Sequence, residues 1–326
     1  MAGVRMTTHF KPPWPARSTF LGDLASSALL ESPRPGTATF LGDLVRNALL
    51  EPPIPPASLT NLLAANALLS RPVNEADAYL RRILRREAVD TSPTSPLRQV
   101  EAALWPVIAT WANVHLLNVS PSGSFSKGTA NASGTDIDLF ISISSTAVEG
   151  LREIYNTLDR ALQSAGYKTR RQNVSLNITV GGHSVDLVPA KRQNLVVQDH
   201  SLYRRKVDSW IKTNVAAHAV HVSMSGRTEE IRIVKLWRDQ LGLDWPSFYL
   251  ELAVIRALGH SPYGDLAANV SRVFEFLRDE FLTARIVDPA NSNNIISDDL
   301  TAAEKLRIGD AGSRARATHY WSQIVA

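Results

Sequence analysis

The chain has 326 residues, with 35 Lys and Arg against 31 Asp and Glu, and it contains no cysteine. Hydrophobic residues make up 44% and charged residues 20%, which is ordinary for a globular chain with a sizeable core. The lack of cysteine excludes disulfides, thiolate metal sites and cysteine nucleophiles. No apolar run reaches the roughly 18 residues of a membrane span, and prolines at 12, 13 and 15 interrupt any signal-peptide core. We therefore expect a cytoplasmic protein with no membrane partner.

Positive charge is concentrated in one part of the sequence. Residues 168–238 hold 13 Lys and Arg against five Asp and Glu, a net charge of +8, whereas the whole chain carries only +4. Such a segment favours a polyanionic ligand, because phosphate groups are attracted to clustered cations. A solvated basic face is the alternative that the charge count leaves open.

The first 72 residues contain an internal repeat. Residues 18–35 and 38–55 share the pattern TFLGDL followed by ALLE and prolines, and residues 58–72 are a weaker third copy. Each unit is about three helical turns long, and the prolines prevent one continuous helix. Two and a half units are too few for a stable solenoid. We predict an N-terminal extension over 1–72, either a partner-binding segment or a tether without a known role.

The folded body is expected to begin near residue 73 and to be α+β. Periodicity predicts helices at 74–89, 97–114 and 147–166, a strand at 135–144, a hairpin of 174–180 with 183–190, and mainly helices from about 205, clearest at 231–242 and 248–259, with others near 264–284 and 300–306. This order predicts a small α+β unit at 73–204, followed by a helical unit at 205–326.

Two polar motifs lie close together in the first lobe. Gly123 and Ser124 follow a short strand, where small residues let backbone N–H groups approach a phosphate. Asp136 and Asp138 are two residues apart on the next predicted strand, so both point to the same side. Their mutual repulsion is costly unless a cation lies between them. A Gly/Ser turn or an Asp-x-Asp pair taken alone would more commonly be a plain turn or a solvated polar face.

A third carboxylate completes the pattern. Asp186 lies about 50 residues after the pair, in the apolar run SVDLVPA, where it needs a partner or a metal to offset its desolvation. Carboxylate oxygens are the ligands that Mg²⁺ prefers. Three such groups beside a phosphate-binding turn predict a two-metal site for phosphoryl transfer, with Asp136, Asp138 and Asp186 as catalytic and metal-binding residues. Two Mg²⁺ ions are expected, and Mn²⁺ as their substitute.

These residues resemble the signature of the polymerase-β-like nucleotidyltransferases. In this sequence GSFSKGT is followed, after six residues, by DIDLF and later by VDLVPA. In that superfamily a Gly-Ser pair, an Asp-x-Asp pair and a third Asp occur in the same order. The sequence is most similar to the branch that holds the CD-NTases (cGAS/DncV-like), the oligoadenylate synthetases and the archaeal-type CCA-adding enzymes. The resemblance covers about residues 75–260, and it implies a two-lobed α+β nucleotidyltransferase fold. In that fold, residues 73–204 would form the catalytic lobe with a small mixed sheet, and the helical lobe at 205–326 would complete the nucleotide-binding cleft.

Two further segments carry the resemblance to this branch. EIRIVKLWRDQ at 230–240 resembles its I-R-x-V-K-x-W helix, whose lysine contacts the triphosphate, and Lys235 stands at that position. PSFYLELAVIRAL at 246–258 resembles its S-[YF]-x-L-E-L-L helix. The resemblance implies that Ser247 reaches a phosphate and that Phe248 stacks on a base. Together with Gly123 and Ser124, these residues form the expected nucleotide-binding set.

The resemblance implies an enzyme that joins nucleoside triphosphates, ATP among them, and releases pyrophosphate. We favour a bacterial CD-NTase making a cyclic oligonucleotide second messenger in antiphage signalling, with a regulatory ligand or partner protein as a further partner. The alternative is template-independent addition of nucleotides to RNA or tRNA 3′ ends, for which the basic segment is also suited. A catalytically idle binding module is the third reading, and the intact carboxylate set argues against it.

We predict that removal of residues 1–72 leaves the basal chemistry intact, because every motif residue lies outside the repeat. Circular dichroism and nucleotide incorporation should agree between the full chain and a chain that begins at residue 73. An insoluble or unfolded product would show that the repeat belongs to the core.

Overall fold

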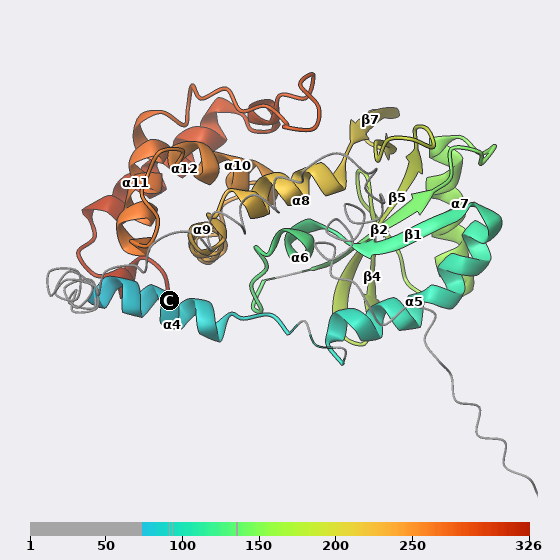
Figure 1. Ribbon diagram of the computed structural model, residues 1–326, viewed down its shortest axis with the longest axis horizontal. Coiled ribbons are helices and arrows are strands. Elements are labelled where there is room, and N and C mark those ends of the chain that lie inside the picture. Colours follow the sequence, from blue (N-terminus) through green and yellow to red (C-terminus); the bar gives the residue numbers. More distant parts are fainter. Residues whose placement is uncertain (1–73, 91, 93, 135) are drawn as a thin grey trace, which may run out of the picture. The chain divides into compact units, whose positions relative to one another are not determined.

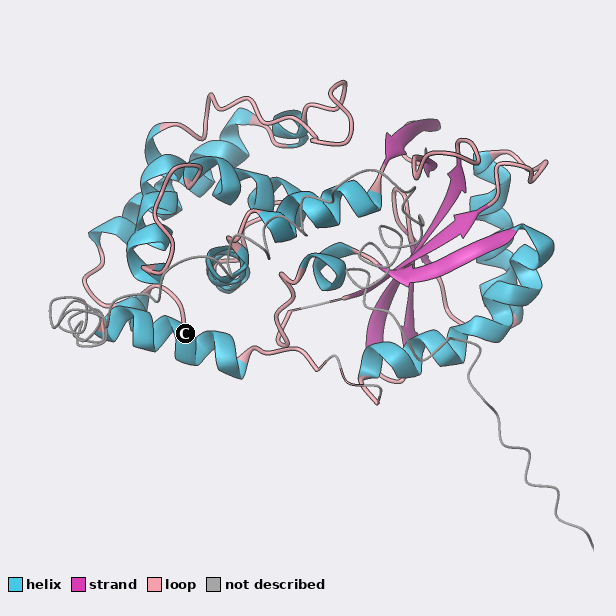
Figure 2. Ribbon diagram, viewed as in Figure 1, coloured by secondary structure: helices cyan, strands magenta, loops and turns pink. Residues whose placement is uncertain are grey.

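The structure is a computed structural model, and it describes residues 74–90, 92, 94–134 and 136–326. The predicted extension over 1–72 lies outside these residues. The described chain mixes helices and strands and then ends in helices (Figure 1 and Figure 2). Its elements in order are α4 (Glu75–Arg86), α5 (Pro96–Ala112), η1 (Asn113–His115), β1 (Leu116–Pro121), α6 (Gly123–Lys127), β2 (Ile137–Ile143), α7 (Leu151–Ser164), β3 (Arg170–Arg171), β4 (Leu176–Val180), β5 (His183–Arg192), β6 (His200–Arg204), β7 (Ser209–Thr213), α8 (Val215–Met224), α9 (Thr228–Gln240), α10 (Ser247–Ala257), α11 (Leu266–Asp279), η2 (Ile296–Asp299), α12 (Ala302–Ala317) and η3 (Trp321–Gln323).

The strands of the described residues form one mixed sheet, as predicted. Its order is β1-β2-β5-β4-β3, and β6 pairs with both β5 and β7. Only β2 and β5 pair in parallel; the other pairs of the described residues are antiparallel. This parallel pair aligns two strands that lie far apart in the sequence, and it is the pair that carries the predicted carboxylates.

The hairpin of β4 and β5 agrees with its sequence pattern. Gly181 and Gly182 form its two-residue turn, with φ of +56° and +85°. Two consecutive residues with positive φ are the requirement of a type I′ turn, which matches the twist of paired strands. The turn therefore fixes the register in which Asp186 of β5 lies opposite Asn177 of β4.

The two faces of the sheet have different coverings. On one face, Leu139, Leu187 and Leu176 stand in one row across three strands and are fully buried. Arg171 continues this row on β3, and its guanidinium lies over the ring of Tyr155 from α7. Helix α7 therefore covers this face. The opposite face carries the aspartates.

The hairpin of β6 and β7 lies beyond the aspartates on that second face. Leu202 of β6 packs with Phe140 and Ala190 in a small apolar cluster. The sequence pattern did not predict these two strands, and β7 lies inside the range expected to be helical. The change from strands to helices therefore comes at Asn214, which caps α8. The lobe boundaries at 73–204 and 205–326 stay predictions.

The helical part is organised around α9. Its residues Ile231, Ile233, Val234, Leu236 and Trp237 are nearly all fully buried, and they share one hydrophobic cluster with α4, α10 and α11. A helix that is apolar on most sides needs such surroundings. Figure 1 shows α9 end-on between these neighbours. This packing holds α9 and α10 rigidly beside α6.

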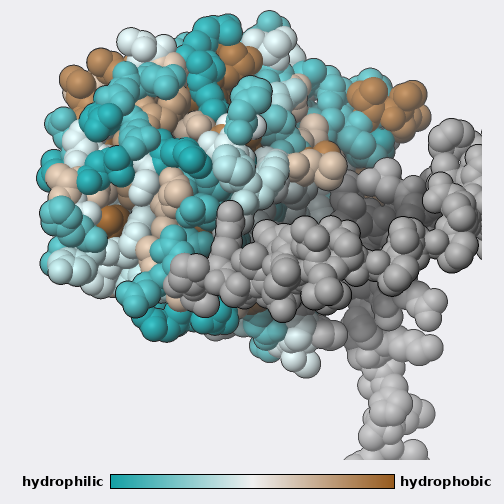
Figure 3. All heavy atoms as spheres, turned by 60° about the vertical axis from the view of Figure 1, so that its left-hand side comes forward, coloured by the Kyte–Doolittle hydropathy of each residue, from teal (hydrophilic) through white to brown (hydrophobic). Residues whose placement is uncertain are grey.

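The surface is mostly polar on the face drawn in Figure 3, where hydrophobic residues form small separate groups between hydrophilic ones. In the part of the chain that the structure describes, no helix is both long enough and apolar enough to cross a membrane.

Candidate active site

The three predicted aspartates come from two neighbouring strands. Asp138 of β2 is the direct partner of Asp186 of β5, and Asp136 lies just before β2. Adjacent strands are about 4.8 Å apart, and directly opposed residues point to the same face. The structure thus brings Asp138 and Asp186 together, with Asp136 exposed at the strand's start.

Their surroundings disfavour ionisation. Burial raises the pKa of Asp138 to about 6, and the negative charge of Asp186 adds to the rise. Burial also raises the pKa of Asp186, against the hydrogen bonds that Asn177 and Gln172 donate to its Oδ1 at 2.7 and 3.1 Å. Raised pKa values mean that the positive charge near the two carboxylates stabilises their ionised forms too little to offset burial. A divalent cation bound between them would supply that charge.

The carboxylates do not form a closed metal cage. Within the described residues, no three His, Cys, Asp or Glu side chains are gathered as a ready metal-binding group. Asp186 already accepts two hydrogen bonds from amide side chains. The carboxylate oxygens are donors that fit Mg²⁺. Because they are not gathered into a ready binding group, the metal-binding role of Asp136, Asp138 and Asp186 stays a prediction.

The predicted Gly/Ser turn is the start of the short helix α6. Gly123 has a φ of +56°, and a Cβ on it would lie 2.6 Å from Cγ of Asp138. The N–H of the preceding Ser122 donates to the Asp138 carbonyl oxygen at 2.8 Å. Glycine is therefore required here because the backbone lies directly against the carboxylate. The first N–H groups of α6 have no acceptor within the helix.

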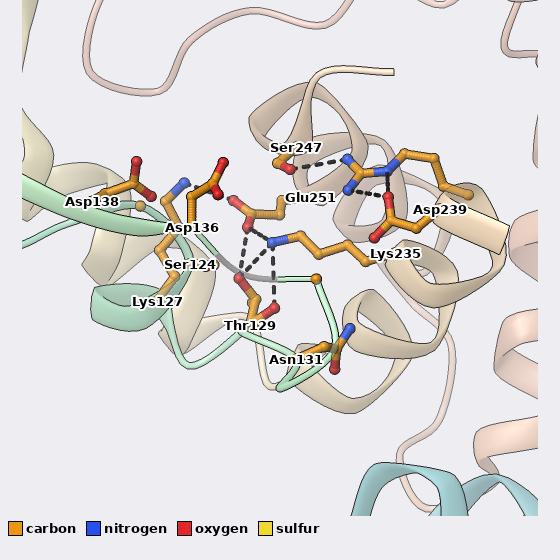
Figure 4. Close-up of a pocket in the computed structure, with 13 residues that line it drawn as sticks. Ser124, Lys127, Thr129, Asn131, Asp136, Asp138, Lys235, Asp239, Ser247 and Glu251 are labelled. Atoms are coloured by element: carbon orange, nitrogen blue, oxygen red, sulfur yellow. Dashed lines mark hydrogen bonds and ion pairs between the residues drawn. The ribbon is translucent and has the colours of Figure 1, made fainter. Parts of the chain in front are cut away.

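A cavity of about 260 Å³ opens between α6, the loop after it, α9 and α10 (Figure 4). Six of the eight predicted site residues line it: Gly123, Ser124, Asp136, Asp138, Lys235 and Ser247. Asp186 and Phe248 do not. Seven lining residues were not predicted: Lys127, Thr129, Asn131, Gly134, Arg238, Asp239 and Glu251.

Glu251 of α10 joins two lysines beside the cavity. Its Oε2 lies 2.8 Å from Nζ of Lys127, and its Oε1 lies 2.6 Å from Nζ of Lys235. Thr129 donates to the same Oε1 at 2.7 Å and accepts from Lys235 at 2.9 Å. All four side chains are buried (Figure 4). Two ammonium groups share one carboxylate, so this group carries a net positive charge toward the cavity.

The pKa values follow from this arrangement. Burial would raise the pKa of Glu251, but the charges of Lys235 and Lys127 outweigh it and hold the value below its usual range. Burial lowers the pKa of Lys235, and Glu251 opposes that change. The carboxylate is therefore ionised, as it must be to keep two buried ammonium groups in place.

Ser247 is fixed by an arginine at the other end of the cavity. Arg238 donates to the Ser247 hydroxyl at 2.9 Å and to the Trp245 carbonyl at 2.8 Å, and its Nε donates to Asp239 at 2.7 Å. Ser247 is exposed. Its contact with a phosphate stays a prediction, and Arg238 beside it is a cation that the sequence analysis did not predict.

Phe248 lies behind the cavity wall. Its ring is 4.4 Å from that of His218, measured between centroids, and Nζ of Lys127 lies 4.6 Å from its centre. His218 in turn bonds to Asp288 at 2.7 Å. The ring thus already contacts two protein groups, and its role in stacking on a base stays a prediction.

Comparisons with known proteins give relatives in sequence and in fold. No protein-family model matches the chain. The chain is 26% identical over 207 residues to the cyclic AMP-AMP-AMP synthase of Escherichia coli (strain MS 115-1). The aligned region covers 56% of this chain and 64% of the relative. It therefore spans slightly less than two thirds of that relative's length.

Solved structures have the same fold. E. coli MS115-1 CdnC with ATP matches with a TM-score of 0.60 and 21% identity, over 73% of this chain and 89% of that one. The Bradyrhizobium diazoefficiens CD-NTase CdnG in complex with GTP has a TM-score of 0.60 and 15% identity, over 75% and 92%. The E. coli CdnC:HORMA-deltaN complex has a TM-score of 0.53 and 20% identity, over 76% and 85%.

This chain resembles the bacterial CD-NTases in sequence and in fold. The predicted resemblance and the predicted α+β nucleotidyltransferase fold are therefore confirmed. In this CD-NTase-like chain, Lys127 and Glu251 could have been found from the motifs GSFSKGT and SFYLEL, which contain them. Arg238 and Asp239 lie just after the I-R-x-V-K-x-W motif of α9, and only the packing of α9 against α10 brings them to the cavity.

We predict that Gly123→Ala inactivates this CD-NTase-like chain, because the new methyl group displaces the Asp138 carboxylate. A shift of about 1 Å at a reacting group can cost roughly 100-fold in rate, so nucleotide incorporation should fall by about that factor. Gly181→Ala is the matched control, since Gly181 has the same φ of +56° but nothing within 4 Å of its Cβ position. Equal activity of the two variants would contradict the close-approach argument.

We predict that Glu251→Gln destabilises the fold by about 3 kcal/mol or more, because two buried ammonium groups lose their counter-charge. Chemical denaturation measures the change in the free energy of unfolding. Glu229→Gln is the control: its ion pair with Arg81 at 2.6 Å is half exposed, and its loss should cost less than about 1 kcal/mol. A Glu251 variant as stable as the control would show that the network is not required.

Proposed function

We propose that this chain is a Mg²⁺-dependent nucleotidyltransferase that joins nucleoside triphosphates into an oligonucleotide second messenger, cyclic in its final form, and releases pyrophosphate. The observation that carries the proposal is the placement of opposed carboxylates, Asp138 and Asp186, directly beside a cavity lined by Lys127, Lys235 and Arg238. Negative groups that can hold metal ions stand next to positive groups that can hold a triphosphate. A nucleotidyltransferase needs both at one place.

The donor triphosphate would lie in the cavity. Backbone N–H groups at the start of α6 and the Ser124 hydroxyl would donate to its phosphate oxygens. Lys235 and the Ser247–Arg238 pair would meet the outer phosphates. Because Lys127 and Lys235 share one carboxylate, the remaining positive charge attracts the triphosphate without leaving either lysine free to move.

Asp136, Asp138 and Asp186 would hold the divalent ions, whose chemistry when bound is to favour the ionised acceptor hydroxyl and to stabilise charge on the leaving pyrophosphate. A ribose hydroxyl oxygen attacks the α-phosphorus, and the bond from that phosphorus to the bridging oxygen breaks. The bonding electrons leave with pyrophosphate, and the hydroxyl proton passes to a carboxylate or to water.

The acceptor decides between two functions. A second nucleotide as acceptor agrees with the activities for which the matched relatives are named, a cyclic AMP-AMP-AMP synthase and CD-NTases. By the same comparison we propose ATP as a substrate and a HORMA-like regulatory partner. From the sequence resemblance to the bacterial CD-NTases we propose an antiphage role in the cytoplasm. An RNA or tRNA 3′ end remains the second candidate, favoured by the net charge of +8 over residues 168–238.

We predict that the protein converts α-labelled nucleoside triphosphates, with Mg²⁺ or Mn²⁺, into a small phosphatase-resistant product. Each triphosphate is supplied alone and in mixture, with and without total tRNA, and products are separated by chromatography after phosphatase treatment. Asp138→Asn should abolish the product and leave the circular dichroism spectrum unchanged, whereas Asp310→Asn, at an exposed position of α12, should change neither.

The products of this assay distinguish the two candidate functions. A closed ring has no terminal phosphate, so phosphatase resistance without RNA supports the cyclic product. Label found only in the RNA band would make the chain a 3′-end transferase. Full activity of Asp138→Asn would remove that residue from the metal-binding set. A preparation without product is tested again with a candidate activating protein.

A further inference from the structure

Four residues form a single row across the aspartate face of the sheet. Asp138 of β2 lies opposite Asp186 of β5, Asp186 lies opposite Asn177 of β4, and Asn177 lies opposite Arg170 of β3. Directly opposed residues in a sheet point to the same side. Arg170 therefore stands on the face that carries the carboxylates, three strand spacings or roughly 14 Å from Asp138.

The neighbouring residues confirm this orientation. Arg171 points to the other face, where its guanidinium lies over Tyr155 of α7. Successive residues of a strand alternate between faces, so Arg170 and Gln172 share the opposite one. Gln172 donates to Oδ1 of Asp186 at 3.1 Å, and the positive charge of Arg170 lowers the pKa of that same carboxyl, against its burial.

The guanidinium of Arg170 is available for a ligand. It is exposed, and no hydrogen bond or ion pair joins it to any residue among those the structure describes. Arg171, by contrast, binds Asp159 and Asn156. Lys168, two residues earlier, is a second exposed cation close to Arg170 in the sequence.

The position of this row matches the side from which an acceptor must come. The donor cavity lies on the Asp136 and Asp138 side, and Asp186 does not line it. In an in-line displacement the attacking and leaving oxygens lie on opposite sides of the phosphorus. An acceptor hydroxyl near Asp138 and Asp186 therefore belongs to a molecule that extends away from the cavity, over β5, β4 and β3.

We propose that Arg170 binds the 5′-phosphate groups of the acceptor nucleotide. This inference rests on the proposed function and adds to it the recognition of the second substrate. An acceptor whose ribose hydroxyl lies at the carboxylates carries its phosphates at the other end of the sugar, in the direction of Arg170. Guanidinium groups are suited to this ligand, because they donate two parallel hydrogen bonds to phosphate oxygens.

The test separates donor from acceptor. Labelled 2′,3′-dideoxy-ATP serves only as donor, because it has no ribose hydroxyl, and ATP, AMP or adenosine is supplied as acceptor. We expect Arg170→Ala to raise the KM for ATP as acceptor at least about tenfold, the size of one lost bond between charged groups. Transfer to adenosine and the KM for the donor should be unchanged. Arg170→Lys should restore part of the loss.

Arg160→Ala is the matched control, since it removes an equal charge from an exposed position of α7, on the other face. An equal loss of transfer to ATP and to adenosine would mean that Arg170 is structural. An unchanged KM for ATP would overturn the inference and leave the proposed function standing. If the wild-type protein labels only an RNA 3′ end and no nucleotide acceptor, the proposed function is wrong and this inference falls with it.

Discussion

The parallel pairing of β2 with β5 is the constraint on which the site depends. Its register sets Asp138 directly opposite Asp186, on one face and one strand spacing apart. Two carboxylates in this position repel each other and are poorly hydrated, so the pairing costs stability in the absence of a cation. The strands are held together in spite of this by their other face, where Leu139 and Leu187 are fully buried. Apolar packing on one side thus imposes an electrostatic cost on the other.

The repulsion between the two carboxylates is not removed by the lysines near the cavity, because these lysines do not pair with the carboxylates. Lys127 and Lys235 are bound to Glu251 and so cannot turn to neutralise Asp138. Gly123 allows the backbone of α6 to lie against the carboxylate without a side chain between them. Negative and positive groups therefore stay separate beside one cavity, and a metal–triphosphate complex is the kind of ligand that satisfies both at once.

Local patterns in the sequence, strand alternation and a turn, predicted Asp136, Asp138, Gly123 and Ser124 as site residues. Lys235 and Ser247 were predicted from the resemblance of their motifs to a known family, and both line the cavity. Lys127 and Glu251, 124 residues apart, form a pair that depends on how α6 meets α10, and no local pattern contains that information. The strands β6 and β7 were missed for a similar reason. Their stability comes from a few apolar contacts with the sheet, such as Leu202 on Phe140, and not from a strong alternating pattern.

The fold is shared by the matched CD-NTases at identities of 15–21%, and that likeness does not distinguish one acceptor from another. Under the proposed function, the surface beyond Asp186 distinguishes acceptors, because the proposed donor cavity is the same whichever molecule attacks. That surface here is a short row, with an amide at Asn177 and a single unpaired guanidinium at Arg170. An RNA chain gains affinity from many phosphate contacts along a track, whereas a nucleotide needs one firm contact at the correct distance. One arginine in register with the carboxylates meets the second requirement, and for this reason the row favours a nucleotide over a polymer as acceptor.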